Sequence, residues 1–294
     1  METMAFVVLP KESDALTACV RDLLARLDAA PQRTVTCAGE CADYLRLASA
    51  EPGLFDAVRT ACLAGRIAPA YAVCPPAWET AAVAAFAAKA QAEQTFFETH
   101  LGRQCETALL LPGCRPAQLP QLLVKCGLRF CILPGETNFP APAPFFWWES
   151  ADGARVLAAC EGEGVRRIDA AGEAALAADD WFRAQCRLPL DLPTLREAPP
   201  APALQGLPLP AGLRIEGAGI ALLDCALAPA ESRLLLAETA GNAVAASVVC
   251  AAPPFGFYAD FTPYEIKKFR IGPDGFAAET DFPVPQPRPA AEDD

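Results

Sequence analysis

The chain has 294 residues, of which 53% are hydrophobic, and a formal net charge of -12. This composition supports a sizeable core and excludes an intrinsically disordered chain. The acidic balance argues against nucleic acid and anionic lipid as partners, and no stretch approaches the ~20 apolar residues that span a bilayer, so we expect neither nucleic-acid nor membrane binding.

The start of the chain lacks a signal-peptide pattern, because Pro10 and Lys11 interrupt its short apolar run. We therefore expect a cytoplasmic protein. Its 13 cysteines are scattered through apolar runs, where thiols in a reducing compartment behave as small buried hydrophobes. Cys37 and Cys41 form the closest pair. A metal or redox role would need a second pair or a histidine nearby, and the sequence has neither there.

Apolar runs alternate with helical patterns in the first half of the chain, which is typical of βαβ units with a parallel sheet. The predicted strands are Ala5–Leu9, Thr34–Cys37, Tyr71–Cys74, Ala108–Leu111 and Arg129–Leu133. The predicted helices run from Ser13 or Asp14 to about Ala29, from Gly39 past Leu47, from Pro52 to Gly65, from about Trp78 to His100 and from Ala117 to Cys126. The fold class that follows is α/β, with a partly parallel sheet and flanking helices over residues 1–160.

The pattern changes in the second half. Phe145–Glu149 and Arg155–Ala159 are predicted to form a hairpin at Asp152-Gly153. Residues 161–212 are predicted to hold one helix, Glu173–Gln185, and a proline-rich linker.

The last third has the period-two pattern of strands. These are Leu213–Glu216, Ile220–Leu227, Ser232–Ala237, Ala243–Cys250 and Tyr264–Ile271, with a hairpin signal at Ala240-Gly241-Asn242. We expect a small antiparallel sheet or half-sandwich over residues 213–272 and a disordered acidic tail over residues 273–294.

Several motifs occur in a meaningful order. The most specific is Leu111-Pro112 followed by Leu119-Pro120-Gln121. The segments Phe96–Gly102, Phe145–Leu157, Arg233–Gly241 and Thr262–Arg270 accompany it. Together they resemble glycoside hydrolase family 38, the class II α-mannosidases, over residues 1–160 and 213–272.

This resemblance implies retaining hydrolysis of α-mannosides, with a zinc ion held by two histidines and two aspartates, one of which is the nucleophile. Most of the matching positions hold other residues. Lys11-Glu12-Ser13-Asp14 stands where the first His-x-Asp is expected, so that Asp14 keeps the aspartate and Glu12 replaces the histidine. Cys74-Pro75-Pro76 stands in place of Glu-x-Asp, and Gly113 stands in place of the nucleophile. We therefore expect no metal site and no zinc cofactor, and a degenerate, non-catalytic α-mannosidase-like protein.

Three carboxylates near strand ends, Glu12, Asp14 and Glu79, are the candidate catalytic residues of an alternative, an active glycoside hydrolase that works without metal. The competing interpretation is that they cap helices. Trp78 and Trp148 are candidate platforms for stacking a sugar, and a place in the core is the alternative for both.

Two kinds of partner follow from the resemblance. A residual cleft would bind carbohydrate. The helical bundle of the family is missing, and its loss would leave apolar surface for a protein partner or for self-association, which makes a protein-interaction subunit a third hypothesis.

Overall fold

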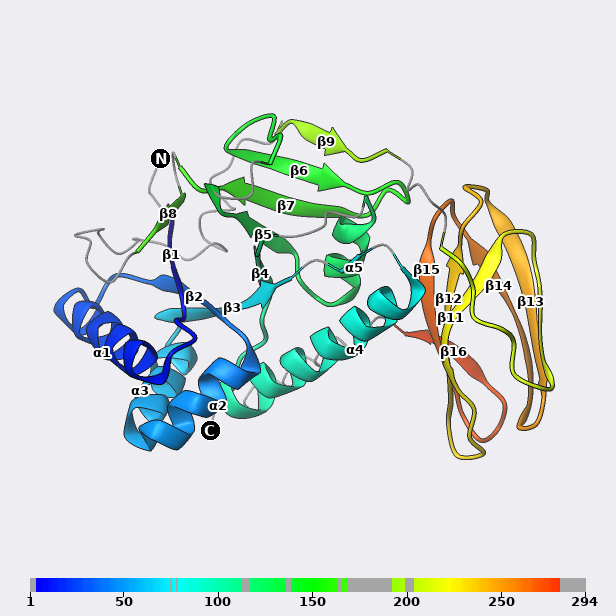
Figure 1. Cartoon of the computed structure of the whole chain (residues 1–294), viewed down its shortest axis with the longest axis horizontal. Helices are drawn as coiled ribbons and strands as arrows, with labels where there is room; N and C mark the ends of the chain where they lie inside the picture. The colour runs from blue at the N-terminus through cyan, green and yellow to red at the C-terminus, as the bar shows by residue number, and fades with distance from the viewer. Residues whose placement is uncertain are drawn as a thin grey trace, which may run out of the picture.

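The computed structural model describes residues 4–74, 76–77, 79–112, 117–135, 139–162, 165–168, 192–198 and 204–280. In this part of the chain, a nine-stranded sheet with helices against one face is followed by two small antiparallel sheets (Figure 1). The predicted α/β fold class with a smaller antiparallel β part is confirmed.

The large sheet has the strand order β8-β1-β2-β3-β4-β5-β7-β6-β9. Its strands are β1 (Met4–Val8), β2 (Val35–Gly39), β3 (Ile67–Val73), β4 (Thr107–Leu110), β5 (Phe130–Leu133), β6 (Phe145–Glu149), β7 (Arg155–Cys160), β8 (Val165–Arg167) and β9 (Thr194–Arg196). Neighbouring strands run parallel except β6 and β7, which form the hairpin predicted at Asp152-Gly153. The sheet curls, so that one face looks inward and the other carries the helices (Figure 1).

The helices of the described residues are α1 (Ser13–Ala29), α2 (Cys41–Ala50), α3 (Pro52–Leu63), α4 (Thr80–Phe96) and α5 (Leu119–Lys125), and a π-helical turn, Phe97–Leu101, extends α4. Leu16, Val20, Leu23 and Leu27 recur every three or four residues and are buried, which explains how α1 packs against the sheet. No helix in the described ranges combines the length and the hydropathy that crossing a membrane requires.

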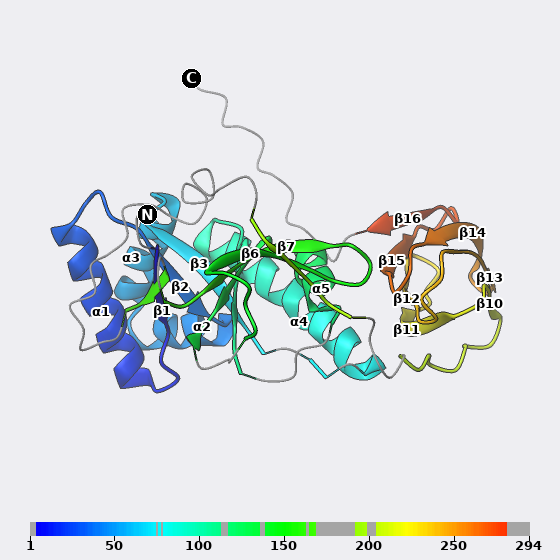
Figure 2. The same ribbon diagram turned by 90° about the horizontal axis from the view of Figure 1, so that it is seen from above.

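The last part of the described chain is a two-sheet sandwich, seen from above in Figure 2. One sheet contains β10 (Leu213–Glu216), β13 (Val244–Ala251) and β14 (Pro254–Phe261), and the other contains β11 (Ile220–Ala226), β12 (Ser232–Glu238), β15 (Ile266–Ile271) and β16 (Ala277–Thr280). Leu222, Leu236, Val248 and Phe269 belong to the apolar cluster between the two sheets.

The predicted hairpin at Ala240-Gly241-Asn242 is wrong, because β12 and β13 lie in different sheets. The buried Glu238 carboxylate explains this connection. It accepts hydrogen bonds from the backbone N–H groups of Ala240 at 2.7 Å, Gly241 at 2.8 Å and Tyr264 at 2.8 Å. This contact holds the turn against the start of β15, so the chain passes to the other sheet.

Four further strands lie where the sequence predicts none. β8 and β9 add to the large sheet from the segment predicted as a helix and a linker, and β16 pairs with β15 inside the predicted tail. β14 was missed as well, although it pairs along its whole length with β13. The predicted helix Glu173–Gln185 and residues 281–294 lie outside the described ranges.

The large sheet and the sandwich share a core. Leu223, Leu235 and Ile266 of the sandwich belong to the same apolar cluster as the helices α1 to α5. The fully buried side chain of Gln121 on α5 reinforces this junction, because its Nε2 donates to the Tyr264 carbonyl at 3.2 Å and its Oε1 accepts from the Ile266 N–H at 2.8 Å.

Candidate functional site

The parallel strands β1 to β5 and β7 end at one edge of the large sheet, which we call the strand mouth. In open parallel sheets this edge is the usual place for a ligand. The residues that follow the strands are Lys11–Asp14 after β1, Glu40–Asp43 after β2, Cys74 after β3, Leu111 and Pro112 after β4, Gly135 after β5 and Glu161 after β7.

Ion pairs connect the residues that follow β1 and β2. Lys11 Nζ lies 3.4 Å from a Glu40 carboxylate oxygen and 3.0 Å from one of Asp43, and Lys89 Nζ of α4 lies 2.6 Å from Glu40. Arg46 pairs with Asp43 as well. Burial acts to raise the pKa of Glu40, but the two lysines outweigh it and lower this pKa. We call Lys11, Glu40, Asp43, Arg46 and Lys89 the mouth cluster.

The buried carboxylate of Glu93 lies beneath the mouth cluster. Its Oε2 accepts a hydrogen bond at 2.6 Å from the backbone N–H of Cys41, the first residue of α2. Burial raises the pKa of Glu93, and the bond from Cys41 only partly opposes this effect. The Asp43 carboxylate likewise accepts from the Glu40 N–H at 2.8 Å. These acids therefore satisfy the first N–H groups of α2, which otherwise have no partner within the helix.

Cys41, the first residue of α2, is a poor nucleophile, because a thiol reacts as its thiolate. Burial and the neighbouring Glu93 raise the pKa of Cys41 to about 11. Away from the strand mouth, burial also raises the pKa of Cys105, just before β4, to about 12 and that of Cys62, near the end of α3, to about 12. Cys74 is the exposed thiol after β3.

The inner face of the large sheet is packed with apolar side chains. They come from eight of its strands and form one buried cluster: Phe6, Ala38, Ala70, Leu109, Phe130, Ile132, Phe145, Leu157, Ala159 and Val165. Half-buried Val8 and Leu111 extend this cluster to the strand mouth. The inner face is thus largely a second core. The polar side chains on it include Thr36 and Thr107, which are buried, and Glu149, which is ion-paired with Arg155 and Arg196.

The three candidate carboxylates lie at helix starts. Glu12 is the N-cap residue of α1, Asp14 is in the first turn of α1, and Glu79 is the N-cap residue of α4, and all three are exposed. Neither N-cap side chain makes a capping hydrogen bond. β2 separates β1 from β3, so the strands that carry Glu12 and Glu79 are about 10 Å apart. A retaining pair of carboxylates stands at about 5 Å.

Of the two candidate tryptophans, Trp148 is part of the core. Its ring is fully buried, lies edge-on to Phe139 at 4.9 Å between centroids, and donates from Nε1 to Glu197 at 2.7 Å. This is a correction to its predicted role, because a ring that is covered on all sides has no face for a sugar. Trp78 lies outside the described ranges. Trp147, the preceding residue of β6, points to the opposite face of the sheet and packs, half-buried, against the inner cluster.

The described residues do not fit the zinc site that the resemblance implies. His100 is exposed, and its ring stacks on Phe96 at 4.5 Å between centroids. Because α4 runs from the end of β3 back towards the start of β4, His100 lies at the opposite end of the sheet from the strand mouth. Within the described ranges, no group of three or more His, Cys, Asp or Glu side chains is placed to hold a metal ion. Gly113 lies outside them.

The candidate acids predicted from the sequence are exposed, and the buried acids were not predicted. Asp43 and Glu93 are almost completely buried, and Glu93, together with the Lys89–Glu40 ion pair, connects α2 to α4. One signal was available for Glu93, which lies three residues after Ala90 and ten after Val83 on the buried side of α4. An acid at such a position in an apolar helix face indicates a buried partner.

No family model matches the sequence, and no curated protein matches it either. Among solved structures, an alpha-mannosidase from Enterococcus faecalis V583 has a TM-score of 0.48 and 12% identity, over 67% of this chain and 30% of that one. A protein in the Glycosyl Hydrolase Family 38 from Enterococcus faecalis gives the same TM-score and identity, over 67% and 29%. The 4-alpha-glucanotransferase from Thermococcus litoralis has a TM-score of 0.44 and 12% identity, over 55% and 28%. The chain spans less than a third of the length of these proteins.

Proposed function

We propose that this chain is a non-hydrolytic binding protein with a glycoside hydrolase-like fold. The observation that carries the proposal is the apolar packing of the inner face, where Phe6, Leu109, Phe130 and Val165 are at most 1% exposed. A hydrolase must place carboxylates beside the scissile bond, and Glu149, the carboxylate that the described strands place on this face, is held by Arg155 and Arg196.

The partners of the acids at the strand mouth support the same proposal. Asp43 is held by Lys11 and Arg46, Glu40 by Lys89 and Lys11, and Glu93 by the first N–H of α2. Glu40 and Glu93 thereby connect α2 to α4, and Asp43 is held by the segment after β1 and by α2 itself. A general acid would instead need a proton to exchange with the substrate.

An active glycosidase that uses Glu12, Asp14 and Glu79 is the competing function. The test is hydrolysis of 4-nitrophenyl α-mannoside by the wild-type chain and by the triple variant Glu12→Gln/Asp14→Asn/Glu79→Gln, each with and without added zinc. We expect both proteins to match the buffer blank under both conditions. Hydrolysis that the triple variant loses, or that added zinc restores, would refute the proposal.

The identity of the bound partner is a separate question. Titration with methyl α-mannoside tests carbohydrate binding, and saturable binding without turnover would agree with the proposal. Size-exclusion chromatography with light scattering tests the predicted self-association. A cytoplasmic location stays a prediction.

A further inference from the structure

Most edge strands in the described part of the chain are short or covered. β8 and β9 have three residues each, and β10 and β16 have four. β11 is longer, but the preceding segment runs beside it, where the Leu207 N–H donates to the Leu222 carbonyl at 2.7 Å. The register of β11 also shifts between Leu222 and Asp224. Short, bulged or covered edges prevent further strands from adding to a sheet.

β14 is the exception among these edges. It has eight residues and pairs with β13 without a register shift. On its other side it pairs with no strand of the described ranges. Asp260 is its single charged residue. A long, regular edge with so little charge is a template on which another strand can pair.

The pairing with β13 shows which backbone groups of β14 face this free edge. The Ala251 N–H of β13 donates at 3.0 Å to the Gly212 carbonyl, on the side of β10 and away from β14. Ala251 pairs with Pro254, so this pair turns its backbone groups apart, and every second pair along an antiparallel ladder does the same. The N–H groups at the free edge are therefore those of Gly256, Tyr258 and Asp260.

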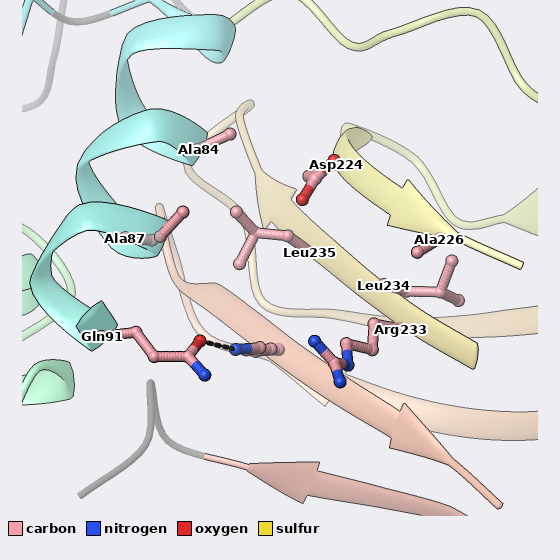
Figure 3. A pocket seen from close by; sticks show the side chains of 10 residues that line it. Ala84, Ala87, Gln91, Asp224, Ala226, Arg233, Leu234 and Leu235 are labelled. Carbon is pink, nitrogen blue, oxygen red and sulfur yellow. Dashed lines mark hydrogen bonds between the residues drawn. The ribbon is translucent and has the colours of Figure 1, made fainter. Parts of the chain in front are cut away.

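The side chain of Tyr258 is exposed beside this edge. Its ring is 84% exposed, more than any other large hydrophobic side chain of the described residues. The outer face of the other sheet is covered instead, since Leu235 of β12 points towards Ala84 and Ala87 of α4 (Figure 3). The exposed tyrosine and the unpaired backbone thus coincide on one strand of the sandwich.

We propose that β14 pairs in antiparallel fashion with β14 of a second copy of this chain, about a two-fold axis at Phe257. In this register Tyr258 of each copy lies opposite Gly256 of the other, so the ring covers backbone that glycine leaves bare. Asp260 lies opposite Pro254 of the other copy, so no like charges face each other. The proline, which lacks an N–H, falls at the end of the ladder, where it costs the fewest hydrogen bonds.

This self-complementary register is the reason to assign the edge to a second copy. A two-fold pair uses the same surface on both chains and closes after two copies, so it buries the free edge without starting a fibre. The inference goes beyond the proposed function and does not depend on it, because β14 contains no residue of the strand mouth.

The experiment is sedimentation velocity of the full chain over a wide range of concentration, at moderate ionic strength to screen the repulsion between two acidic chains. We expect a reversible equilibrium between monomer and dimer. Tyr258→Lys should weaken the dimer about tenfold, because the two-fold axis brings two new positive charges close together and both aromatic contacts are lost. The exposure of Tyr258 means that the substitution leaves the core of the sandwich intact.

The matched control is Leu63→Lys, which adds the same charge at an exposed leucine of α3 and should dimerise like the wild type. Hydrogen exchange gives a second readout. The N–H groups of Gly256, Tyr258 and Asp260 should exchange more slowly as the wild-type concentration rises, and should not do so in Tyr258→Lys. A monomer at every concentration would leave the edge to a strand of another protein and would overturn the proposal. A Tyr258→Lys variant that dimerises as tightly as the wild type would overturn it as well.

Discussion

At the scale of single residues, Glu93 is the buried acid of α4 that caps the start of α2. It is 2% exposed, and its carboxylate accepts the first N–H of α2. Glu93→Ala leaves that buried donor unpaired, so we expect a loss of about 1–3 kcal/mol in the free energy of unfolding. Glu93→Gln keeps an acceptor and should cost much less. Urea unfolding of both variants at pH 7 measures the difference, and equal losses would contradict the capping role.

The pH dependence of the same pair follows from the raised pKa of Glu93. Its pKa in the folded state lies above the ordinary value of 4.5, so the folded state binds the proton more tightly than the unfolded state. The stability that this carboxyl contributes is present below pH 4.5 and is lost as pH rises through its folded pKa. Glu93→Gln lacks this loss and should therefore gain on the wild type as pH rises.

Some site residues can be predicted from the sequence and others cannot, for a physical reason. Exposed acids at helix starts, such as Glu12 and Glu79, follow from local sequence because a helix start is a local feature. The partner of Glu93 lies 52 residues away at Cys41, and local sequence carries no record of that distance. The burial of Trp148 depends in the same way on Phe139 and Glu197, which belong to other segments.

At the scale of elements, α5 and β15 are joined by one side chain. Gln121 uses both ends of its amide on the backbone of residues 264–266, inside the shared core. Gln121→Ala leaves a buried N–H and a buried carbonyl unpaired, and we expect it to cost about 1–3 kcal/mol. Thermal unfolding should show one transition for the wild type and a lower midpoint for the variant. A wild type that melts in two separate steps would contradict the shared core.

Helices were easier to predict than strands. The three-to-four spacing of Leu16, Val20 and Leu23 identifies α1 without tertiary information. β14 begins at Pro254 and contains Gly256, which local reasoning takes as signs of a turn, yet pairing with β13 makes it a strand. β8 and β9 are three residues long and exist through their neighbours in the large sheet.

At the scale of the whole molecule, the sequence predicts the order of the two parts, because alternating strand and helix patterns give way to strands of period two. The structure accordingly has a large sheet followed by a sandwich. The packed inner face does not follow from the sequence. Buried strands of a parallel sheet have apolar residues on both faces, whether the inner one is filled or open. The cluster extends across the sheet from Val165 on β8 to Phe145 on β6, and its burial depends on how far the sheet curls.

The most direct test of this account is the stability of Leu109→Ala, because Leu109 lies fully buried in the inner cluster. A packed core predicts a loss of about 2–5 kcal/mol in the free energy of unfolding, measured with urea. The matched control is Leu63→Ala at the end of α3, where the side chain is 53% exposed and the loss should be within about 0.5 kcal/mol. An equally small loss for Leu109→Ala would mean that the inner face is an open cleft, and would contradict the account.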